Sequence, residues 1–462
     1  MEKQNLFKKS LLIFRRDLRL EDNSALCAAT QQSEQIIPCF IFDPRQVEKS
    51  NKYRSTSSLQ FMIESLVDLE NQLAKYNAKL YLFYGKAEDV VKKLIAQEQI
   101  DAVFCNKDYT PFSIKRDEEI EHACIKERVA FNSFHDALLV YPEEIATADG
   151  TPYEVFTAFF KKASKKHKLR CILRIKDSIW YKKPIALQEL KIIYKRTLSK
   201  ANKNIRNKGG RSAALKILRN LGVFADYSKT HDVPSLETTR LSPHHKFGTV
   251  SIRETYQAVE NKLGINHPLI RQLFWRDFFT YVAFHAPAVF GSAYKEKYNN
   301  LPWENDTKKF KAWCEGKTGF PIVDAGMRQL NKTGFMHNRV RMIVGSFLVK
   351  DLHIDWQWGE QYFAQQLVDY DPAVNNGNWQ WVASTGCDAQ PYFRIFNPWL
   401  QQKKFDPQCT YIKTWVPELK KFDPKYIHTW FKDTSPPHKS YPRPIIEHEI
   451  ESRKAKMVYK KV

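Results

Sequence analysis

The sequence predicts an α/β domain with a parallel five-stranded sheet, followed by an all-α domain, and three observations support this. Over the first 135 residues short apolar runs alternate with helical patterns, whereas from residue 207 the periodicity is helical and Gly or Pro interrupts it. All 11 tryptophans lie at or after Trp180, so the two parts also differ in composition. A chain of 462 residues exceeds the roughly 250–300 residues that one hydrophobic core serves, which favours two domains.

Five apolar runs bounded by Asp, Gly, Pro or Asn are the expected strands, and they cover residues 10–14, 36–42, 79–84, 102–105 and 129–134. Leu59, Ile63 and Leu66 recur at helical spacing between the second and third runs. Because strands and helices alternate, we expect a doubly wound, Rossmann-like sheet. The turn after the first strand contains no glycine, so this sheet is predicted to bind an accessory ligand or to act as support, and not to bind NAD.

The region between the two domains is basic. Turn signals interrupt the pattern from residue 136 to 206, and residues 161–219 contain 20 Lys or Arg against two acids, which is most of the formal net charge of +22. Such a field attracts polyanions, so nucleic acid is the leading candidate partner, while a solvated linker is the alternative. We therefore predict an α/β domain over 1–135, a basic linker over 136–206 and a helical domain over 207–462.

Composition excludes several classes of protein. With 43% hydrophobic and 13% aromatic residues, the chain lacks the signature of disorder. No apolar stretch approaches the roughly 20 residues of a membrane span, so we expect a cytoplasmic protein with no membrane partner. We also expect a monomer. The eight cysteines are scattered without a C-x-x-C pair or a histidine at zinc spacing, which predicts reduced thiols and no metal site.

Two segments of the helical part concentrate polar groups more densely than an apolar core would. Residues 319–342 place Asn338, Arg341 and Met342 at helical spacing, along one side of a turn. Residues 369–381 contain acids, amides and indoles within thirteen positions. No hydrolytic nucleophile or metal signature accompanies them.

These two segments and five further motifs resemble the photolyase and cryptochrome family almost from end to end. The other motifs are residues 14–19 with Asp22 and Asn23, 153–157, 239–243, 275–278 and 391–398. The resemblance is closest to photolyases that repair cyclobutane pyrimidine dimers. It implies a carbon–carbon lyase that binds damaged double- or single-stranded DNA and transfers an electron from excited, reduced FAD to a flipped-out dimer.

The resemblance also implies an FAD site between helices. The residues expected at the phosphates and ribityl chain are Tyr227, Thr238, Thr239, Arg240, Leu241 and Ser242, and those expected around the ring and adenine are Arg276, Asn338, Arg341, Asp369 and Asp371. Hydroxyls, backbone amides and a guanidinium are the groups that a pyrophosphate needs. Asn375 is expected to face the flavin N5, where plant cryptochromes have an acid, so its amide favours repair over signalling.

Indoles and polar side chains complete the implied machinery. Trp379, Trp356 and Trp303 match the family's chain of electron-transfer tryptophans, although isolated tryptophans usually belong to a core. The dimer pocket is expected to be lined by Trp275, Trp381, Asn338, Met342 and Gln272, with Arg339 and Arg394 on phosphates. Gln272 occupies the position of a glutamate in related dimer photolyases, which puts repair efficiency or lesion preference in question.

An antenna chromophore is expected beside residues 106–117, where Thr110 replaces an acid of the folate-binding relatives. Methenyltetrahydrofolate, a deazaflavin and an empty site all stay open. Three alternative functions also stay open. They are a blue-light receptor of the cryptochrome kind, a (6-4) photolyase, which residues 242–248 resemble, and a basic DNA-binding protein without catalysis.

Overall fold

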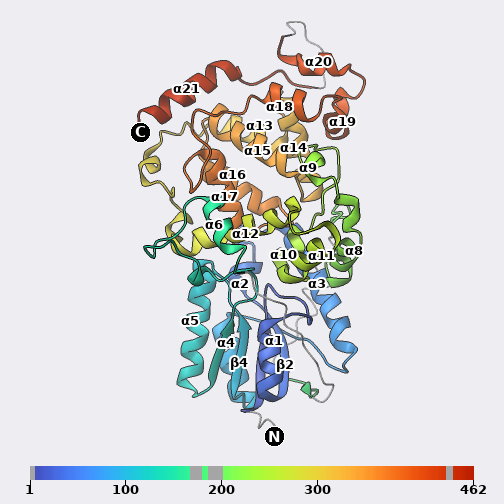
Figure 1. Cartoon of the computed structure of the whole chain (residues 1–462), viewed down its shortest axis with the longest axis vertical. Helices are drawn as coiled ribbons and strands as arrows, with labels where there is room; N and C mark the ends of the chain where they lie inside the picture. Colours follow the sequence, from blue (N-terminus) through green and yellow to red (C-terminus); the bar gives the residue numbers. More distant parts are fainter. Residues whose placement is uncertain (1–5, 167–178, 186–200, 433–440) are drawn as a thin grey trace. The chain divides into compact units, whose positions relative to one another are not determined.

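The computed structural model describes residues 6–166, 179–185, 201–432 and 441–462 (Figure 1). The chain forms two compact units, each assembled from separate segments. Unit 1 contains Met1–Lys203, Asn207–Val223 and Arg240–Phe284, and unit 2 contains Asn204–Arg206, Phe224–Thr239 and His285–Val462. The domain boundaries expected at residues 135 and 206 stay a prediction. Within the described ranges, no helix combines the length and the apolar character needed to cross a bilayer.

Unit 1 is built on a parallel sheet with the strand order β3-β2-β1-β4-β5. The strands are β1 (Phe7–Phe14), β2 (Ser33–Phe42), β3 (Tyr81–Tyr84), β4 (Ala102–Asn106) and β5 (Ala130–Phe134). Leu11 pairs with Ile37 on one side and with Val103 on the other, and all three are fully buried. The five predicted strands are confirmed. They could be recognised because strands covered on both faces have continuous apolar sequences.

Helices connect these strands. They are α1 (Ser24–Gln32), α2 (Pro44–Val47), α3 (Thr56–Ala74), α4 (Ala87–Glu98) and α5 (Pro111–Lys126), and Figure 1 shows α4 and α5 alongside each other. The side chains of Asn23, Ser55 and Thr110 each accept a backbone N–H at a helix start. The Rossmann-like fold class of the first domain is therefore confirmed.

The predicted linker contains a helix that the sequence pattern did not indicate. α6 (Phe156–Ala163) buries Phe156 and Phe159, so this segment packs into unit 1 and does not run freely over the surface. The basic residues within 167–178 and 186–200 lie outside the described residues. Unit 1 also contains η1 (Pro142–Glu144), α8 (Arg211–Arg219), α10 (Ser242–Phe247), α11 (Ile252–Leu263) and α12 (Pro268–His285) up to Phe284.

A close approach joins the loop after β1 to α10. Leu18 donates its backbone N–H to the carbonyl of Phe247 at 3.0 Å. Gly248 ends α10 at φ +58°, and a Cβ atom there would lie 2.1 Å from the carbonyl oxygen of Arg16. Only glycine therefore permits this contact.

A buried ionic cluster lies beside Gly248 in unit 1. Arg253 donates to the carboxylates of Asp22 and Asp136 at 3.0 and 2.8 Å, and Arg19 donates to Asp136 at 2.6 Å. All four side chains are at most 4% exposed. Backbone carbonyls of Asp22, Asp136 and Gly248 accept the further guanidinium hydrogens. The cluster is electrically neutral and is satisfied from within.

Unit 2 is helical throughout its described residues, so the predicted all-α second part is confirmed. Its helices are α9 (Tyr227–Thr230), α13 (Thr307–Glu315), α14 (Pro321–Thr333), α15 (Asn338–Ser346) with the π-helical turn η6 (Phe347–Asp351), α16 (Trp356–Gln366), α17 (Pro372–Ala383), α18 (Pro398–Phe405), α19 (Thr410–Trp415), α20 (Pro424–His428) and α21 (His448–Lys460). One large core joins α13 to α20 and buries Trp313, Trp356, Trp379, Trp399 and Trp430. The concentration of tryptophans seen in the sequence therefore builds this core.

Candidate active site

Asn375 on α17 has a fixed amide orientation. Its Nδ2 donates to the backbone carbonyl of Glu360 at 3.1 Å and to Glu360 Oε1 at 3.0 Å. Since both partners are acceptors, the amide NH2 must face them. The carbonyl Oδ1 therefore faces away, and it makes no hydrogen bond within the described part of the chain. Asn375 as a whole is 9% exposed, and this carbonyl is available to a ligand that offers an N–H group.

Glu360 on α16 is the residue that orients this amide. Burial raises the pKa of its carboxyl to about 7, and the hydrogen bond from Asn375 only partly opposes the shift. The two side chains come from neighbouring helices, since α16 packs against α17. Glu360 was not predicted from the sequence, because its spacing from Asn375 follows no helical or strand period.

His337 supplies an unmatched donor in the same unit. It caps α15, and its Nδ1 accepts the backbone N–H of Arg339 at 3.2 Å. The ring proton must then lie on Nε2, which is buried and has no hydrogen-bond partner in the described structure. Burial, together with neighbouring cations, lowers the pKa of His337 to about 4, so the ring is neutral. This residue was also missed, although it directly precedes the predicted Asn338.

The predicted ion pair between Arg341 and Asp369 is present. Arg341 Nη2 lies 2.9 Å from Asp369 Oδ2, and the carboxylate side chain is 4% exposed. Arg341 also donates from Nε to the carbonyl of Met336 at 2.8 Å. Asp371 is buried at the start of α17 and caps it by accepting the N–H of Val374. Both carboxylates therefore have a fixed position, Asp369 beside the Arg341 guanidinium and Asp371 at the start of α17.

α15 and α17 carry the other predicted substrate residues of unit 2. Asn338 donates from Nδ2 to the sulfur of Met342 at 3.9 Å, so the two side chains share one side of α15, as the helical spacing predicted. Asn338 is exposed, whereas Met342 and Trp381 are half-buried. α15 packs against α17, which carries Trp381. Polar, thioether and indole groups are thus available to a ligand on these two helices.

Arg339 and Arg394 differ in their surroundings. Arg339 forms a two-point ion pair with Asp232, with distances of 3.1 and 2.7 Å, and its guanidinium lies 4.3 Å from the ring centre of Phe405. Arg394 is exposed, and its guanidinium has no partner among the described residues. Of the two arginines expected at phosphates, only Arg394 has its charge available in this structure.

The three indoles of the expected electron-transfer chain belong to one core. Trp379 and Trp356 are each 3% exposed, and the half-buried Trp303 packs against the same cluster. The indole of Trp379, a residue of α17, packs against α16 at Gly359. A Cβ atom at Gly359 would lie 2.2 Å from this indole. Gly359 is three residues after Trp356 and so lies on the same side of α16. The segments that carry Trp356 and Trp303 are also in contact. The backbone N–H of Asp355, which precedes Trp356, donates at 2.9 Å to Oδ1 of Asn305, which is two residues after Trp303.

Unit 1 carries the segment from Arg240 to Ser242. Arg240 has a left-handed φ of +50°, which is uncommon outside glycine and clusters at functional sites. Leu241 is buried, and Ser242 begins α10, which has no side-chain cap. On unit 2, Tyr227, Thr238 and Thr239 are half-buried. Burial raises the pKa of Tyr227 to about 12.

α12 of unit 1 holds three predicted residues. Trp275 stacks on Phe156 with ring centres 3.6 Å apart and an interplanar angle of 7°. Gln272 is exposed one turn before it, so the amide and the indole lie on the same side of α12. Arg276 donates to the carbonyl of Ala137 at 2.6 Å, which attaches the segment after β5 to this helix.

The carboxyl ends of β1 and β4 form a second polar site in unit 1. Arg15 follows β1, and its Nη1 lies 2.7 Å from Asp117 on α5, while Arg116 Nη2 lies 3.0 Å from the same carboxylate. Arg15 Nη2 is buried and makes no hydrogen bond in the described structure, whereas Arg116 Nη2 has its ion-pair contact with Asp117. Adjacent strands β1 and β4 are where the strand order reverses, and ligands of doubly wound sheets bind at this point.

Comparison with known proteins covers the whole chain. The family profile for DNA photolyase matches residues 10–177, and the profile for the FAD binding domain of DNA photolyase matches residues 269–461. A deoxyribodipyrimidine photo-lyase of Alkalihalophilus pseudofirmus is 36% identical, and the alignment covers 97% of each chain. The chain belongs to the DNA photolyase family. The resemblance inferred from the motifs is thereby confirmed, as is FAD as the cofactor.

Solved structures agree with this membership of the DNA photolyase family. An archaeal photolyase from Sulfolobus tokodaii, described with two FAD molecules and a novel light-harvesting cofactor, has a TM-score of 0.88 and 42% identity, and the match covers 98% of this chain and 100% of that one. A cryptochrome from Synechocystis has a TM-score of 0.89 but 28% identity, with coverage of 98% and 100%. For a DNA photolyase, the unmatched Asn375 acceptor and His337 donor fit a flavin nucleotide, which carries both donors and acceptors.

Proposed function

We propose that this DNA photolyase splits cyclobutane pyrimidine dimers in double- or single-stranded DNA with light, as a cytoplasmic monomer. The orientation of Asn375 carries the proposal. Its amide carbonyl is available to a flavin N–H, where an acid would repel negative charge on a reduced flavin. The full-length match to a deoxyribodipyrimidine photo-lyase supports dimer repair over the cryptochrome and (6-4) alternatives.

FAD, when bound and reduced, supplies the electron that opens the dimer after it absorbs light. We assign its phosphates and ribityl chain to Tyr227, Thr238, Thr239, Arg240, Leu241 and Ser242, and its ring and adenine to Arg276, Asn338, Arg341, Asp369, Asp371 and Asn375. Asp369 neutralises Arg341 and fixes the direction of its guanidinium.

The substrate residues are Gln272, Trp275, Asn338, Arg339, Met342, Trp381 and Arg394. An enzyme that acts on a base must flip it out of the duplex, which costs a few kcal/mol and least for a damaged base. Indoles such as Trp275, which Phe156 supports from one side, provide flat surfaces for the flipped bases. Gln272 can still donate a hydrogen bond to a base carbonyl, and Arg394 can approach a phosphate freely.

Trp379, Trp356 and Trp303 are assigned to the delivery of electrons that restores reduced flavin. Their common core supports the assignment, and the greater exposure of Trp303 supports its place at the outer end of the chain. Gly359 supports it further, because this glycine lets the Trp379 indole lie directly on the helix that begins with Trp356.

The antenna chromophore is assigned to the carboxyl ends of β1 and β4, and we name a second flavin nucleotide as its class. The Sulfolobus tokodaii photolyase is described with two FAD molecules. In this chain, Arg15 keeps a buried guanidinium nitrogen without a hydrogen bond, which suits a phosphate or ring carbonyl. Folate and deazaflavin remain the competing assignments. The test is the amount of FAD released by denaturation, since two FAD per chain supports a flavin antenna and one FAD per chain contradicts it.

The activity is tested with a duplex oligonucleotide that contains one cyclobutane dimer. Purified protein with chemically reduced flavin should convert the dimer to two pyrimidines under near-ultraviolet or blue light, and not in the dark. Chromatography of the digested DNA measures the product. Unchanged dimers in the light would refute repair, and conversion of a (6-4) product instead would establish the (6-4) alternative.

Phenylalanine variants test the electron-transfer assignment. Trp379→Phe, Trp356→Phe and Trp303→Phe should each slow photoreduction of oxidised flavin at least about tenfold, because phenylalanine is much harder to oxidise than indole. Repair by chemically reduced enzyme should persist. Trp313→Phe is the matched control, since Trp313 is buried in the same core, 6.2 Å from Trp379 between ring centres, but lies outside the assigned chain. Equal photoreduction in all four variants would contradict the assignment.

A further inference from the structure

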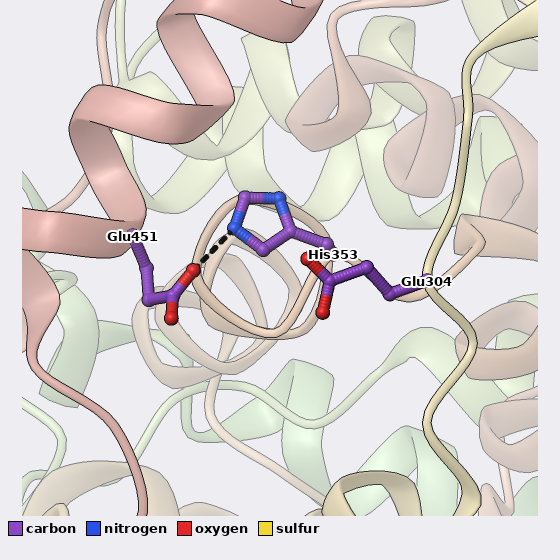
Figure 2. A group of neighbouring side chains, drawn as sticks. All are labelled: Glu304, His353 and Glu451. Carbon is purple, nitrogen blue, oxygen red and sulfur yellow. Dashed lines mark hydrogen bonds and ion pairs between the residues drawn. The ribbon is translucent and has the colours of Figure 1, made fainter.

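Three metal-ligating side chains of unit 2 meet at a place that the proposed activity does not use. Glu304 lies before α13, His353 lies between η6 and α16, and Glu451 is in the first turn of α21. Their possible ligand atoms all lie within 4.8 Å of one another, and His353 Nε2 is 2.8 Å from Glu451 Oε2. Figure 2 shows the imidazole between the two carboxylates, each on a different segment.

The backbone positions two of these residues without help from their side chains. Glu304 donates its N–H to the carbonyl of His353 at 2.8 Å, and the N–H of Asp355 donates to Asn305 Oδ1 at 2.9 Å. Asn305 and His353 both have a left-handed φ of +51°. The loops that carry Glu304 and His353 therefore keep their relative position whether or not their side chains are paired.

The third residue sits on a helix that is attached at both ends. At the start of α21, His448 Nδ1 lies 2.5 Å from Asp351 Oδ1, and near its end the Tyr459 hydroxyl donates to the carbonyl of Ala383 at 2.7 Å. His448 and Tyr459 are buried. Glu451 is thus presented from a fixed helix, so binding a cation would require little ordering of the backbone.

A replaceable positive charge already occupies this place. The Lys454 ammonium contacts the Glu304 carboxylate, and Lys309 Nζ lies 3.5 Å from it. The Lys454 side chain is 47% exposed, so its flexible stem can withdraw into water. Two carboxylates beside an imidazole attract a cation, and lysine supplies that charge when no metal is bound.

We propose that Glu304, His353 and Glu451 bind one divalent cation, with Zn²⁺ as the first candidate. The bound cation displaces the Lys454 ammonium and attaches α21 to the two loops that carry Glu304 and His353. A mixed imidazole and carboxylate set suits Zn²⁺ or Mn²⁺ better than Mg²⁺, which prefers oxygen ligands in a hydrated octahedron. Glu304 is exposed, so its carboxylate can move to the bond length of about 2 Å that zinc requires. The open side leaves room for water.

The test uses the full-length, flavin-loaded protein and Zn²⁺ or Mg²⁺ alone as probes. Isothermal titration should show one saturable Zn²⁺ site, and saturating Zn²⁺ should raise the melting temperature by about 2–4 °C, whereas equal Mg²⁺ should not. Glu451→Gln and His353→Asn should each weaken Zn²⁺ binding at least about tenfold. Asparagine tolerates the left-handed backbone at position 353. Glu449→Gln, an exposed acid on the same turn of α21, is the matched control and should bind Zn²⁺ as the native chain does.

Lys454→Met distinguishes a metal site from a salt-bridge cluster. If the cation displaces the ammonium, removing it should strengthen Zn²⁺ binding severalfold, because no competing charge has to leave. A cluster that serves only as a salt bridge predicts no saturable site in either protein. Absence of saturable binding, or equal affinity in the native chain, His353→Asn and Lys454→Met, would overturn the proposal, since zinc would then be bound elsewhere on the surface.

Discussion

Two polar regions of the molecule, one in each unit, differ in how completely their groups are paired. In unit 1, Arg19 and Arg253 face Asp22 and Asp136, and every charge has a partner within the cluster. In unit 2, Asn375 keeps a carbonyl without a donor and His337 keeps an N–H without an acceptor, within the residues described. The paired charges of unit 1 stabilise the fold, whereas the Asn375 carbonyl and the His337 N–H stay available to a ligand.

The largest predicted effect comes from breaking the satisfied cluster. Arg253→Met should lower the free energy of unfolding by about 3–5 kcal/mol, because it leaves two buried carboxylates with one guanidinium. Equilibrium urea unfolding measures the change. Arg206→Met is the control, since the Arg206–Glu237 pair is exposed and should contribute below about 1 kcal/mol. Equal losses in both variants would mean that burial does not distinguish these pairs.

The same cluster predicts an acid dependence. Burial alone would raise the pKa of Asp136, but attraction to Arg19 and Arg253 outweighs it and holds this pKa below its usual range. A depressed carboxyl pKa contributes stability above the unfolded value of about 3.9, and this contribution is lost as the pH falls through the native pKa. Arg253→Met should therefore show less loss of stability than the native chain below about pH 4.

An intermediate effect is expected at the orienting residue of the candidate site. Burial raises the pKa of Glu360 to about 7. The native state therefore loses stability as the pH rises from about 4.5, where the unfolded carboxyl ionises, to about 7, and the full loss persists above pH 7. Glu360→Gln should raise the free energy of unfolding by roughly 1–3 kcal/mol at pH 8, with little change at pH 4.5. Urea unfolding of FAD-saturated protein at both pH values measures it. Exposed Glu296→Gln should change neither, and a gain that is equal at the two pH values would contradict the electrostatic cause.

The smallest effect compares the two arginines expected at phosphates. Arg394→Gln should reduce the slope of log binding constant against log salt by about 0.9, since a free guanidinium that meets a phosphate releases one counterion. Arg339→Gln should change the slope less, because Asp232 already neutralises Arg339. Fluorescence anisotropy with a dimer-containing duplex at several salt concentrations measures both slopes. A larger change for Arg339→Gln would show that its ion pair opens on DNA.

Local pattern was sufficient for the sheet and for the faces of single helices. The five strands followed from apolar runs, and Asn338 with Met342 followed from helical spacing. α6 was not predicted, because eight residues between turn signals and lysines give too short a period to recognise. The motifs that matched the family were required for FAD and for the Arg341–Asp369 pair.

Contacts between distant segments were beyond the sequence. Asp232 reaches Arg339 across 107 positions, and Glu360 meets Asn375 from a neighbouring helix. Periodicity identifies which side of a helix is apolar but not which other helix covers it. The metal-ligating cluster was absent from the prediction for the same reason, since Glu304, His353 and Glu451 come from three segments with no shared spacing.

The division of unit 1 into separate segments has a consequence for synthesis of the protein. Its last segment ends at Phe284, and Gly248 within that segment contacts the loop after the first strand. At roughly 5–20 residues per second, a ribosome needs about 15–60 s to make that length. The sheet and its connecting helices are complete by residue 134, but α3 must wait through this interval for α8 and α10, which pack against it. A chaperone that shields exposed apolar surface would therefore act on α3 of the nascent chain.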